Sequence, residues 1–212
     1  MEEQKTINEI PNKLTITVIG ARSTGKTTLL NSLIFPQIII SNKYIRTYGY
    51  DIRFLPINDN IIIKFFDIGD VELEKNEDVF NSMAWYSHYV FYLIDPNIKE
   101  SLKYIDIFED AFKKNKTILI FSKFDQVNDK NYYINNNDVQ RFIQRHNITN
   151  NNIFYVNSID ENSVKNFKKE LFDIIQNDLF NKIFTNIKYD DFTKNPILFH
   201  RALVERSRKI GC

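Results

Sequence analysis

The sequence predicts an α/β fold, with a six-stranded, mostly parallel sheet and helices on both of its faces. Six short apolar runs alternate along the chain with segments of helical periodicity. These runs are apolar almost throughout, which is typical of strands that are buried on both faces. Sheets of this kind bind ligands beyond the carboxyl ends of their strands, so the residues that follow each strand are the candidates for function.

The first half of the chain contains three expected strands and two expected helices. The first strand is LTITVIG, a β-branched run from Leu14, and it leads into the helix KTTLLNSLI, which ends before Pro36. The second and third strands are YDIRFLPI and IIIKFFD, and the turn residues NDN between them predict a hairpin. After an acidic stretch from Asp70 to Asp78, the segment VFNSMAWYSH is expected to be helical.

The second half continues the alternation. The fourth strand is YVFYLID, and it is followed by SLKYIDIFEDAFKKN, an expected helix with Leu102, Ile105, Phe108 and Phe112 on one stripe. The fifth strand is TILIFSK, and the Asn-rich region 126–152 is expected to be a loop around the helix VQRFIQRH. The last expected elements are the strand IFYVNS and the helix SVKNFKKELFDIIQNDL.

Composition restricts the class of protein. With 212 residues, 43% of them hydrophobic, the chain is long enough for one packed domain with an appendage. The 28 basic and 27 acidic residues leave a net charge of +1, so no nucleic-acid partner is expected. The single cysteine, Cys212, fits a reducing compartment. No signal-peptide pattern and no run of about 20 apolar residues is found, so we expect a cytoplasmic protein.

A phosphate-binding loop is predicted directly after the first strand, where the chain reads GARSTGKTT. Glycines allow the backbone N–H groups to surround phosphate oxygens, the helix N-terminus adds partial positive charge, and the lysine reaches the terminal phosphates. The residues expected to bind nucleotide here are Gly20, Arg22, Ser23, Thr24, Gly25, Lys26, Thr27 and Thr28.

Two oxygen ligands for Mg²⁺ are expected from different strand ends. The Thr27 hydroxyl follows the first strand, and Asp67 follows the third. A single aspartate at a strand end is often only a cap or turn residue. The convergence of two strand ends on one ligand favours the metal role.

The order of the phosphate loop, DIG, SKFD and VNSID resembles the small GTPases of the Ras superfamily, and most closely their Rab or Rab-like branch. The resemblance covers roughly Leu14 to Leu179. It implies the Ras-like P-loop NTPase fold, with a GTPase domain over residues 13–180. Residues 1–12 and 181–212 are then N-terminal and C-terminal extensions.

The resemblance also implies how guanine is recognised. Asp125 takes the place of the family aspartate that accepts two hydrogen bonds from the base, and Lys123 would pack over the base. Ser122 stands where the family has asparagine, so a supporting bond is shortened or lost. Ser158 and Ile159 match the loop whose backbone N–H contacts the guanine oxygen. The expected ligands are therefore GTP or GDP with Mg²⁺.

The segment RTYGYD resembles the family's first switch, whose threonine closes onto Mg²⁺ and the γ-phosphate. Thr47 takes that role, which completes an expected metal set of Thr27, Thr47 and Asp67. The alternative is an ordinary loop threonine before a strand. Effector or complex-subunit proteins are expected to bind through regions 40–51 and 68–86, as in the family.

The second switch departs from the family pattern Asp-x-x-Gly-Gln. The chain has Gly69 one place early, followed by Asp70 and Val71, and no glutamine occurs between Asp67 and Ser122. In the family the glycine N–H contacts the γ-phosphate and the glutamine orients the attacking water. Gly69 is kept as a candidate nucleotide contact, and losing the glutamine predicts slow hydrolysis.

Arg22 is a second departure, beside the expected γ-phosphate. An arginine supplied in cis can stabilise transition-state charge, but Arg22 on this tight loop has too little distance to fold back. We therefore expect it to obstruct the site rather than to catalyse.

The C-terminal segment 181–212 allows two interpretations. Ile197, Leu198, Ala202 and Leu203 stand near helical spacing and favour a docking helix. A lipid on Cys212, together with basic residues, would instead give a tail with peripheral membrane attachment, and an unmodified terminal cysteine is equally compatible.

The favoured function is a Rab-like guanine-nucleotide switch in intracellular vesicle trafficking, with slow intrinsic hydrolysis. The alternative is a constitutively nucleotide-bound scaffold subunit, as in Rab-like ciliary transport complexes. A P-loop ATPase or nucleoside kinase is disfavoured because SKFD has no role there.

Overall fold

The structure is a computed structural model that describes residues 12–36, 46–58, 61–69, 76–123 and 136–180. The chain divides into two compact units, Met1–Phe172 and Asp173–Cys212, and the whole sheet lies in the first. Asp125, Cys212, region 181–212 and parts of both expected switches lie outside the described residues. Within the described part, no helix is both long and apolar enough to cross a membrane.

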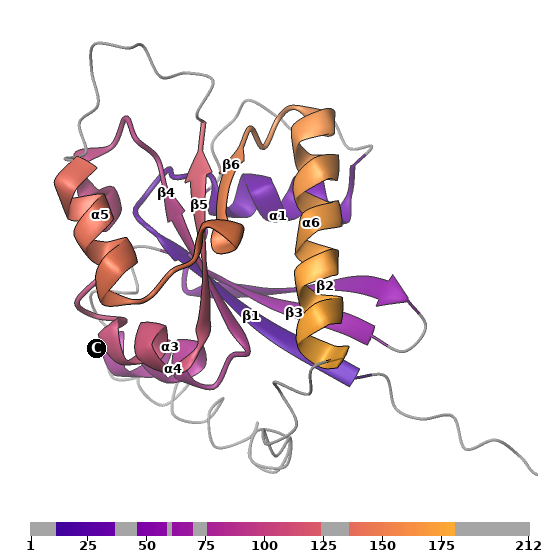
Figure 1. Ribbon diagram of the computed structural model, residues 1–212, viewed down its shortest axis with the longest axis horizontal. Helices are drawn as coiled ribbons and strands as arrows, with labels where there is room; N and C mark the ends of the chain where they lie inside the picture. Colours follow the sequence, from indigo (N-terminus) through magenta and orange to yellow (C-terminus); the bar gives the residue numbers. More distant parts are fainter. Residues whose placement is uncertain (1–11, 37–45, 59–60, 70–75, 124–135, 181–212) are drawn as a thin grey trace, which may run out of the picture. The chain divides into compact units, whose positions relative to one another are not determined.

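One six-stranded sheet forms the centre of the first unit, in the order β2-β3-β1-β4-β5-β6 (Figure 1). Every neighbouring pair is parallel except β2 and β3, which form the expected hairpin. The predicted fold class is thereby confirmed. The strands are β1 (Asn12–Gly20), β2 (Tyr50–Asn58), β3 (Ile61–Ile68), β4 (Tyr89–Ile94), β5 (Lys116–Ser122) and β6 (Ile153–Val156).

One face of the sheet is covered by α1 (Lys26–Ile34) and by the part of α6 (Glu161–Phe180) that belongs to the first unit (Figure 1). Strand residues alternate between faces, and Phe91 of β4 points to this side, where its ring lies 6.1 Å from that of Phe167. The Lys168 ammonium donates to the Leu33 carbonyl at 3.1 Å and so ties α6 to α1. These contacts fix α1 beside the end of β1.

Three helices, α3 (Glu77–Trp85), α4 (Glu109–Lys114) and α5 (Asn136–Arg145), cover the opposite face. Tyr92, the neighbour of Phe91 in β4, packs edge-on or tilted against Phe112 and Phe142, with both centroid distances 5.4 Å. Near β1, the Thr17 hydroxyl lies 2.6 Å from that of Ser87, just beyond α3. Short 3₁₀ turns occur at Lys99–Leu102 and Asn150–Asn152.

The expected single helix over 101–115 is wrong for its first part. Only Glu109–Lys114 is α-helical, and turns occupy the residues between Leu102 and Glu109. The Ser101 carbonyl, which a helix would pair with the Ile105 N–H, accepts the Tyr92 hydroxyl at 2.8 Å instead. The Ile105 N–H bonds to the Leu102 carbonyl, three residues back. A tertiary hydrogen bond therefore overrides the apolar periodicity.

His88 fastens the start of β4 to β1. Its Nδ1 atom accepts a hydrogen bond from the Thr15 N–H at 3.0 Å, and the side chain is only 6% exposed. A backbone N–H can only donate, so Nδ1 carries no proton and the imidazole is neutral. Burial lowers the pKa of His88 to about 4.

This pKa predicts a loss of stability in acid. In the unfolded chain the histidine pKa is ~6.5. Between this value and the lower folded pKa, the unfolded chain binds more protons than the folded chain. The stabilisation of the fold by neutral His88 is therefore complete above the unfolded pKa. As the pH falls from the unfolded to the folded pKa, the free energy of unfolding decreases by at most about 3 kcal/mol. We expect His88→Asn, whose amide oxygen can accept the same bond, to flatten the dependence of the free energy of unfolding on pH. Urea denaturation across the window measures this, and an unchanged slope would contradict it.

Candidate functional site

The site is built at the carboxyl edge of the sheet. Because β1, β3, β4, β5 and β6 are parallel, the residues that follow them meet at one edge, and antiparallel β2 begins there. The register places Gly20 of β1 opposite Leu93 of β4, and Asp67 of β3 opposite Asp51 of β2. The predicted functional residues therefore gather from separate parts of the chain.

The loop between β1 and α1 has a backbone that only particular residues adopt. Gly20 approaches β4 so closely that a Cβ atom on it would lie 2.6 Å from the Leu93 carbonyl oxygen. Gly25 has a left-handed φ of 89° and precedes α1, whose N-terminus has no side-chain cap and no acidic residue in its first turn. The first N–H groups of α1 are therefore left for an anion, as phosphate binding requires.

Lys26 arches back over this loop. It is buried, and its ammonium donates to the carbonyl oxygens of Gly20 and Ala21 at 2.8 and 2.9 Å. The buried Thr24 hydroxyl also donates to the Ala21 carbonyl, at 2.9 Å. These bonds hold the loop closed around the lysine. Arg22, by contrast, is exposed at the rim of the loop.

The remaining loop residues expected to bind nucleotide lie beside these. Ser23 is exposed and has a left-handed φ of 62°. Thr28 is half-buried in the first turn of α1, where its carbonyl accepts the Ser32 hydroxyl at 3.0 Å.

The three expected metal ligands come together. The Thr27 hydroxyl donates to Asp67 Oδ2 at 2.6 Å and lies 2.9 Å from the Thr47 hydroxyl. The three residues belong to α1, to the end of β3 and to the segment before β2. Only the tertiary structure could test whether this set converges.

Asp67 is fully buried, and its Oδ1 atom has no hydrogen-bond partner among the described residues. Burial raises the pKa of this carboxyl, while the Thr27 hydrogen bond and the charges of Lys26 and Arg53 act in the opposite direction. An unsatisfied carboxylate oxygen beside two hydroxyls is a set of hard oxygen donors, which fits Mg²⁺. The described residues contain no group of three or more His, Cys, Asp or Glu that could hold a metal in another way.

Gly69 packs directly against the segment that carries Thr47. Its N–H donates to the Gly49 carbonyl at 2.8 Å, and a Cβ on Gly69 would lie 2.2 Å from the Thr47 carbonyl oxygen. The glycine that we expected to contact nucleotide thus uses its N–H within the protein. The residues before β2 and after β3 are joined at this point.

The segment after β5 reaches the phosphate loop through Lys123. Its ammonium donates to the Ser23 carbonyl at 2.6 Å and pairs with Asp95 at 2.9 Å. Ser122 is buried, and its hydroxyl donates to the Ile94 carbonyl of β4 at 3.3 Å. Asp125, the expected guanine-reading carboxylate, lies outside the described residues.

The segment after β6 is held against α1. The carbonyl of buried Ser158 lies 2.5 Å from the Ser32 hydroxyl of α1. The side chain of Ile159 is 66% exposed, and its N–H donates to Asn157 Oδ1 at 3.1 Å. The structure thus brings this segment to the same edge, but with the Ile159 N–H already bonded.

Two residues that hold the site together, Asp95 and Ser32, were not predicted from the sequence. Asp95 is 2% exposed and follows β4 directly, so its place after an apolar strand was the signal that could have identified it. Ser32 lies inside the expected first helix and carries no such signal. Its role depends on a contact with a residue 126 positions away.

Two comparisons with known proteins bear on this site. Residues 15–123, just over half of the chain, match the model of a protein family described as 50S ribosome-binding GTPase. The matched segment begins in β1 and ends at Lys123, so it includes the phosphate loop and the three oxygen donors around Asp67. A comparison with curated proteins gave no match.

The contact at Gly69 predicts a difference between two glycines. Gly69→Ala forces backbone apart and should lower the free energy of unfolding by about 1–3 kcal/mol. Gly49→Ala is the matched control, because Gly49 has a φ of 67° but no atom within 4 Å of an added Cβ. It should lose only about 1 kcal/mol, from backbone strain. Urea denaturation compares the two, and an equal or smaller loss for Gly69→Ala would refute the contact.

Proposed function

The chain belongs to the GTPase family whose model it matches, and from this premise we propose that it is a Rab-like guanine-nucleotide switch with slow intrinsic hydrolysis, acting in vesicle trafficking. Family membership implies guanine-nucleotide binding. The Rab-like branch and the trafficking role rest on the motif order RTYGYD, DIG and SKFD. The family description also names the 50S ribosome. A net charge of +1 gives this chain no general attraction to RNA, so we do not extend the proposal to ribosome binding.

The observation that supports the proposal most is the cluster of Thr27, Thr47 and Asp67 beside the uncapped N-terminus of α1. Hydroxyl and carboxylate oxygens would hold Mg²⁺, and the backbone N–H groups would hold the phosphates. Thr47 belongs to the segment that resembles the family's first switch, and in this proposal it would close onto Mg²⁺ when the γ-phosphate is present. A residue of this kind makes the site sensitive to the terminal phosphate.

Each residue of the site has a defined task in this proposal. Lys26 and the N–H groups of the loop bind the β- and γ-phosphates, and Lys123 and Asp125 hold the guanine base. Mg²⁺, when bound, would neutralise phosphate charge. Binding and orientation are therefore well provided for, while a group that positions the attacking water is missing.

Slow turnover follows from that deficit. The chain lacks glutamine between Asp67 and Ser122, and the Gly69 N–H is bonded to the Gly49 carbonyl rather than left for a γ-phosphate. Arg22 is exposed at the rim of the loop, where its bulk would limit access to the terminal phosphate. These features leave Lys26 and the uncapped N-terminus of α1 in place to bind phosphate.

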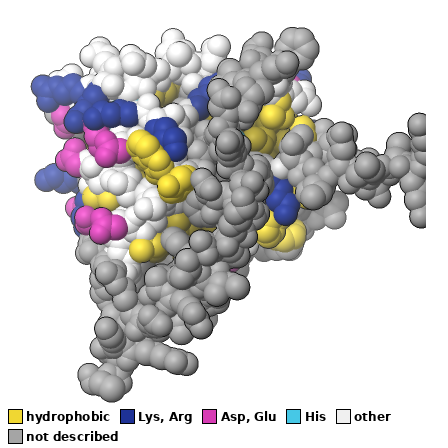
Figure 2. All heavy atoms as spheres, turned by 90° about the horizontal axis from the view of Figure 1, so that it is seen from below, with side chains coloured by type: hydrophobic (Ala, Val, Ile, Leu, Met, Phe, Trp, Pro, Cys, Tyr) yellow, Lys and Arg dark blue, Asp and Glu magenta, His cyan; other side chains and the backbone are white. Residues whose placement is uncertain are grey.

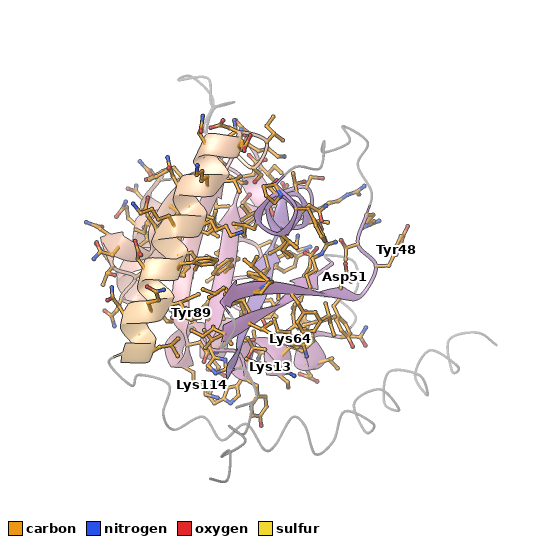
Figure 3. All side chains as sticks on the ribbon, turned by 90° about the vertical axis from the view of Figure 1, so that its right-hand side faces the viewer. Lys13, Tyr48, Asp51, Lys64, Tyr89 and Lys114 are labelled. Atoms are coloured by element: carbon orange, nitrogen blue, oxygen red, sulfur yellow. The ribbon has the colours of Figure 1, made fainter. Side chains whose placement is uncertain are left out.

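Partner proteins would contact the two segments that meet at Gly69. Tyr48 is 74% exposed and points away from the ribbon at the start of β2 (Figure 3). Trp85 and Tyr86, at the end of α3, are also exposed, and the Lys114 ammonium lies 4.4 and 5.1 Å from their ring centroids. Seen from below, hydrophobic side chains lie at the surface beside basic ones (Figure 2). Exposed aromatic residues of this kind are typical of protein interfaces.

A constitutively nucleotide-bound scaffold is the second candidate. The observation that favours it is the Gly69–Gly49 bond, which joins the two switch segments through backbone atoms of the protein. If this bond persists with GDP as with GTP, the partner surface does not change when the nucleotide changes.

The test of nucleotide binding uses the full chain and a fluorescent GDP. We expect GTP and GDP to displace it. ATP should compete at least about 100-fold more weakly, because a site built to hydrogen-bond guanine leaves groups unpaired with adenine.

Chelation of Mg²⁺ should speed GDP release. Asp67→Asn should abolish that dependence, whereas Asp51→Asn, an exposed carboxylate opposite Asp67, should preserve it. Equal competition by ATP would contradict the proposal.

A single-turnover experiment tests slow hydrolysis, and tryptophan fluorescence distinguishes a switch from a scaffold. The GTP-loaded chain should form GDP at or below about 10⁻⁴ per second, the range of an unassisted GTPase. The only tryptophan, Trp85, is the last residue of α3 and lies within the expected partner region 68–86, so its fluorescence reports on that region. A switch predicts different spectra with GDP and a non-hydrolysable GTP analogue, and a scaffold predicts the same spectrum. Rapid GDP formation would rule out slow turnover.

A further inference from the structure

Asp95 is a buried carboxylate residue that has no role in the proposed function as described above. It follows β4, is 2% exposed, and its Oδ1 atom accepts the N–H of Asn97 at 2.9 Å and the Asn97 side-chain amide at 3.2 Å. Its own N–H and carbonyl both bond to the Ser101 hydroxyl, at 3.1 and 2.8 Å. A carboxylate fixed on so many sides has a single orientation.

The remaining oxygen of Asp95 holds Lys123. The distance from Asp95 Oδ2 to the Lys123 ammonium is 2.9 Å, and the same ammonium donates to the Ser23 carbonyl of the phosphate loop at 2.6 Å. Lys123 also has a left-handed backbone, with a φ of 53°. A lysine side chain is long and flexible, and its orientation depends on what binds its ammonium group. Here a buried carboxylate supplies that restraint.

The residue before Lys123 does not share this task. The Ser122 hydroxyl donates to the Ile94 carbonyl in β4, although its Cβ lies 4.0 Å from the place of a Cβ on Gly25. No described hydrogen bond therefore runs from the side chain of Ser122 to the phosphate loop. The segment that would read guanine is joined to the loop that would hold phosphate by Lys123.

We propose that Asp95 is a positioning residue for nucleotide retention, which aims Lys123 across the phosphate loop and so compensates for the serine at position 122. The inference rests on the proposed guanine-nucleotide function and adds a residue to it. Without its buried counter-charge, the Lys123 ammonium would be drawn into water, and the contact with Ser23 would loosen. Both the loop and the base-covering part of Lys123 would then be less restrained, and nucleotide would leave sooner.

Release of a fluorescent GDP from the full chain tests the inference. Asp95→Asn keeps the shape of the side chain and removes its charge, and it should speed release about tenfold or more, as expected for a hydrogen bond between charged groups. Glu109→Gln is the matched control, because Glu109 is a sheltered carboxylate that bonds to Lys113 at 2.8 Å in another part of the domain. It should leave release unchanged. Equal release from Asp95→Asn and the wild type would overturn the inference.

A double-mutant cycle distinguishes positioning from a general structural role. If Asp95 acts through Lys123, Asp95→Asn should add less than about threefold to the release rate of Lys123→Met, instead of the tenfold seen alone. Equal effects in both backgrounds would overturn the inference.

A second variant covers the case in which Asp95→Asn fails to fold. Ser122→Asn restores a side chain long enough to reach the loop, and it should slow GDP release from the otherwise unaltered chain. If Asp95→Asn does fold, adding Ser122→Asn to it should recover part of the lost retention. Release no slower than wild type from Ser122→Asn alone would overturn the inference.

Guanine-nucleotide binding by the wild-type chain shows whether the proposed function fails or only the role of Asp95. If the full chain binds no guanine nucleotide, both are overturned. If it binds GDP with the expected preference and the Asp95 variants behave as the wild type, only the role of Asp95 is lost.

Discussion

The hydrogen bond from the Thr27 hydroxyl to Asp67 is the contact on which the rest of the site depends. It joins the first turn of α1 to the end of β3, two elements that are 40 residues apart. A fully buried carboxylate is costly unless its oxygens have partners, and here only one oxygen has a partner among the described residues. The fold therefore maintains a buried site with one unsatisfied acceptor, and a bound cation would relieve that cost.

In the function that we propose, the residues around this contact bind nucleotide but promote its hydrolysis poorly. The phosphate loop is closed on itself by Lys26, and it is held from outside by Lys123, while Arg22 is exposed. The residues that would position water for hydrolysis belong to the segment after β3. That segment is joined to the one before β2 by the bond between Gly69 and Gly49. These contacts are the physical basis of our proposal that the chain retains its nucleotide and cleaves it slowly.

The end of β4 has a larger part in the site than its sequence indicates. The Ile94 carbonyl accepts the Ser122 hydroxyl, and Asp95 holds Lys123, so these two residues of the predicted guanine motif depend on the end of this strand. β4 is central in the sheet and its residues are all buried, which makes it a rigid support. On our proposal, Asp95 at this rigid strand end supplies the restraint on the phosphate loop that the Ser122 side chain does not.

The sequence by itself determined the fold class, because six apolar runs alternating with helical segments leave few alternatives to a covered parallel sheet. It also identified the phosphate loop, whose spacing is local. Only the tertiary structure decided that helix 101–115 is shortened by Tyr92, that the Gly69 N–H is already bonded, and that Asp95 holds Lys123. Periodicity and motif spacing record what neighbours along the chain require, whereas these bonds join residues that become neighbours only when the sheet forms.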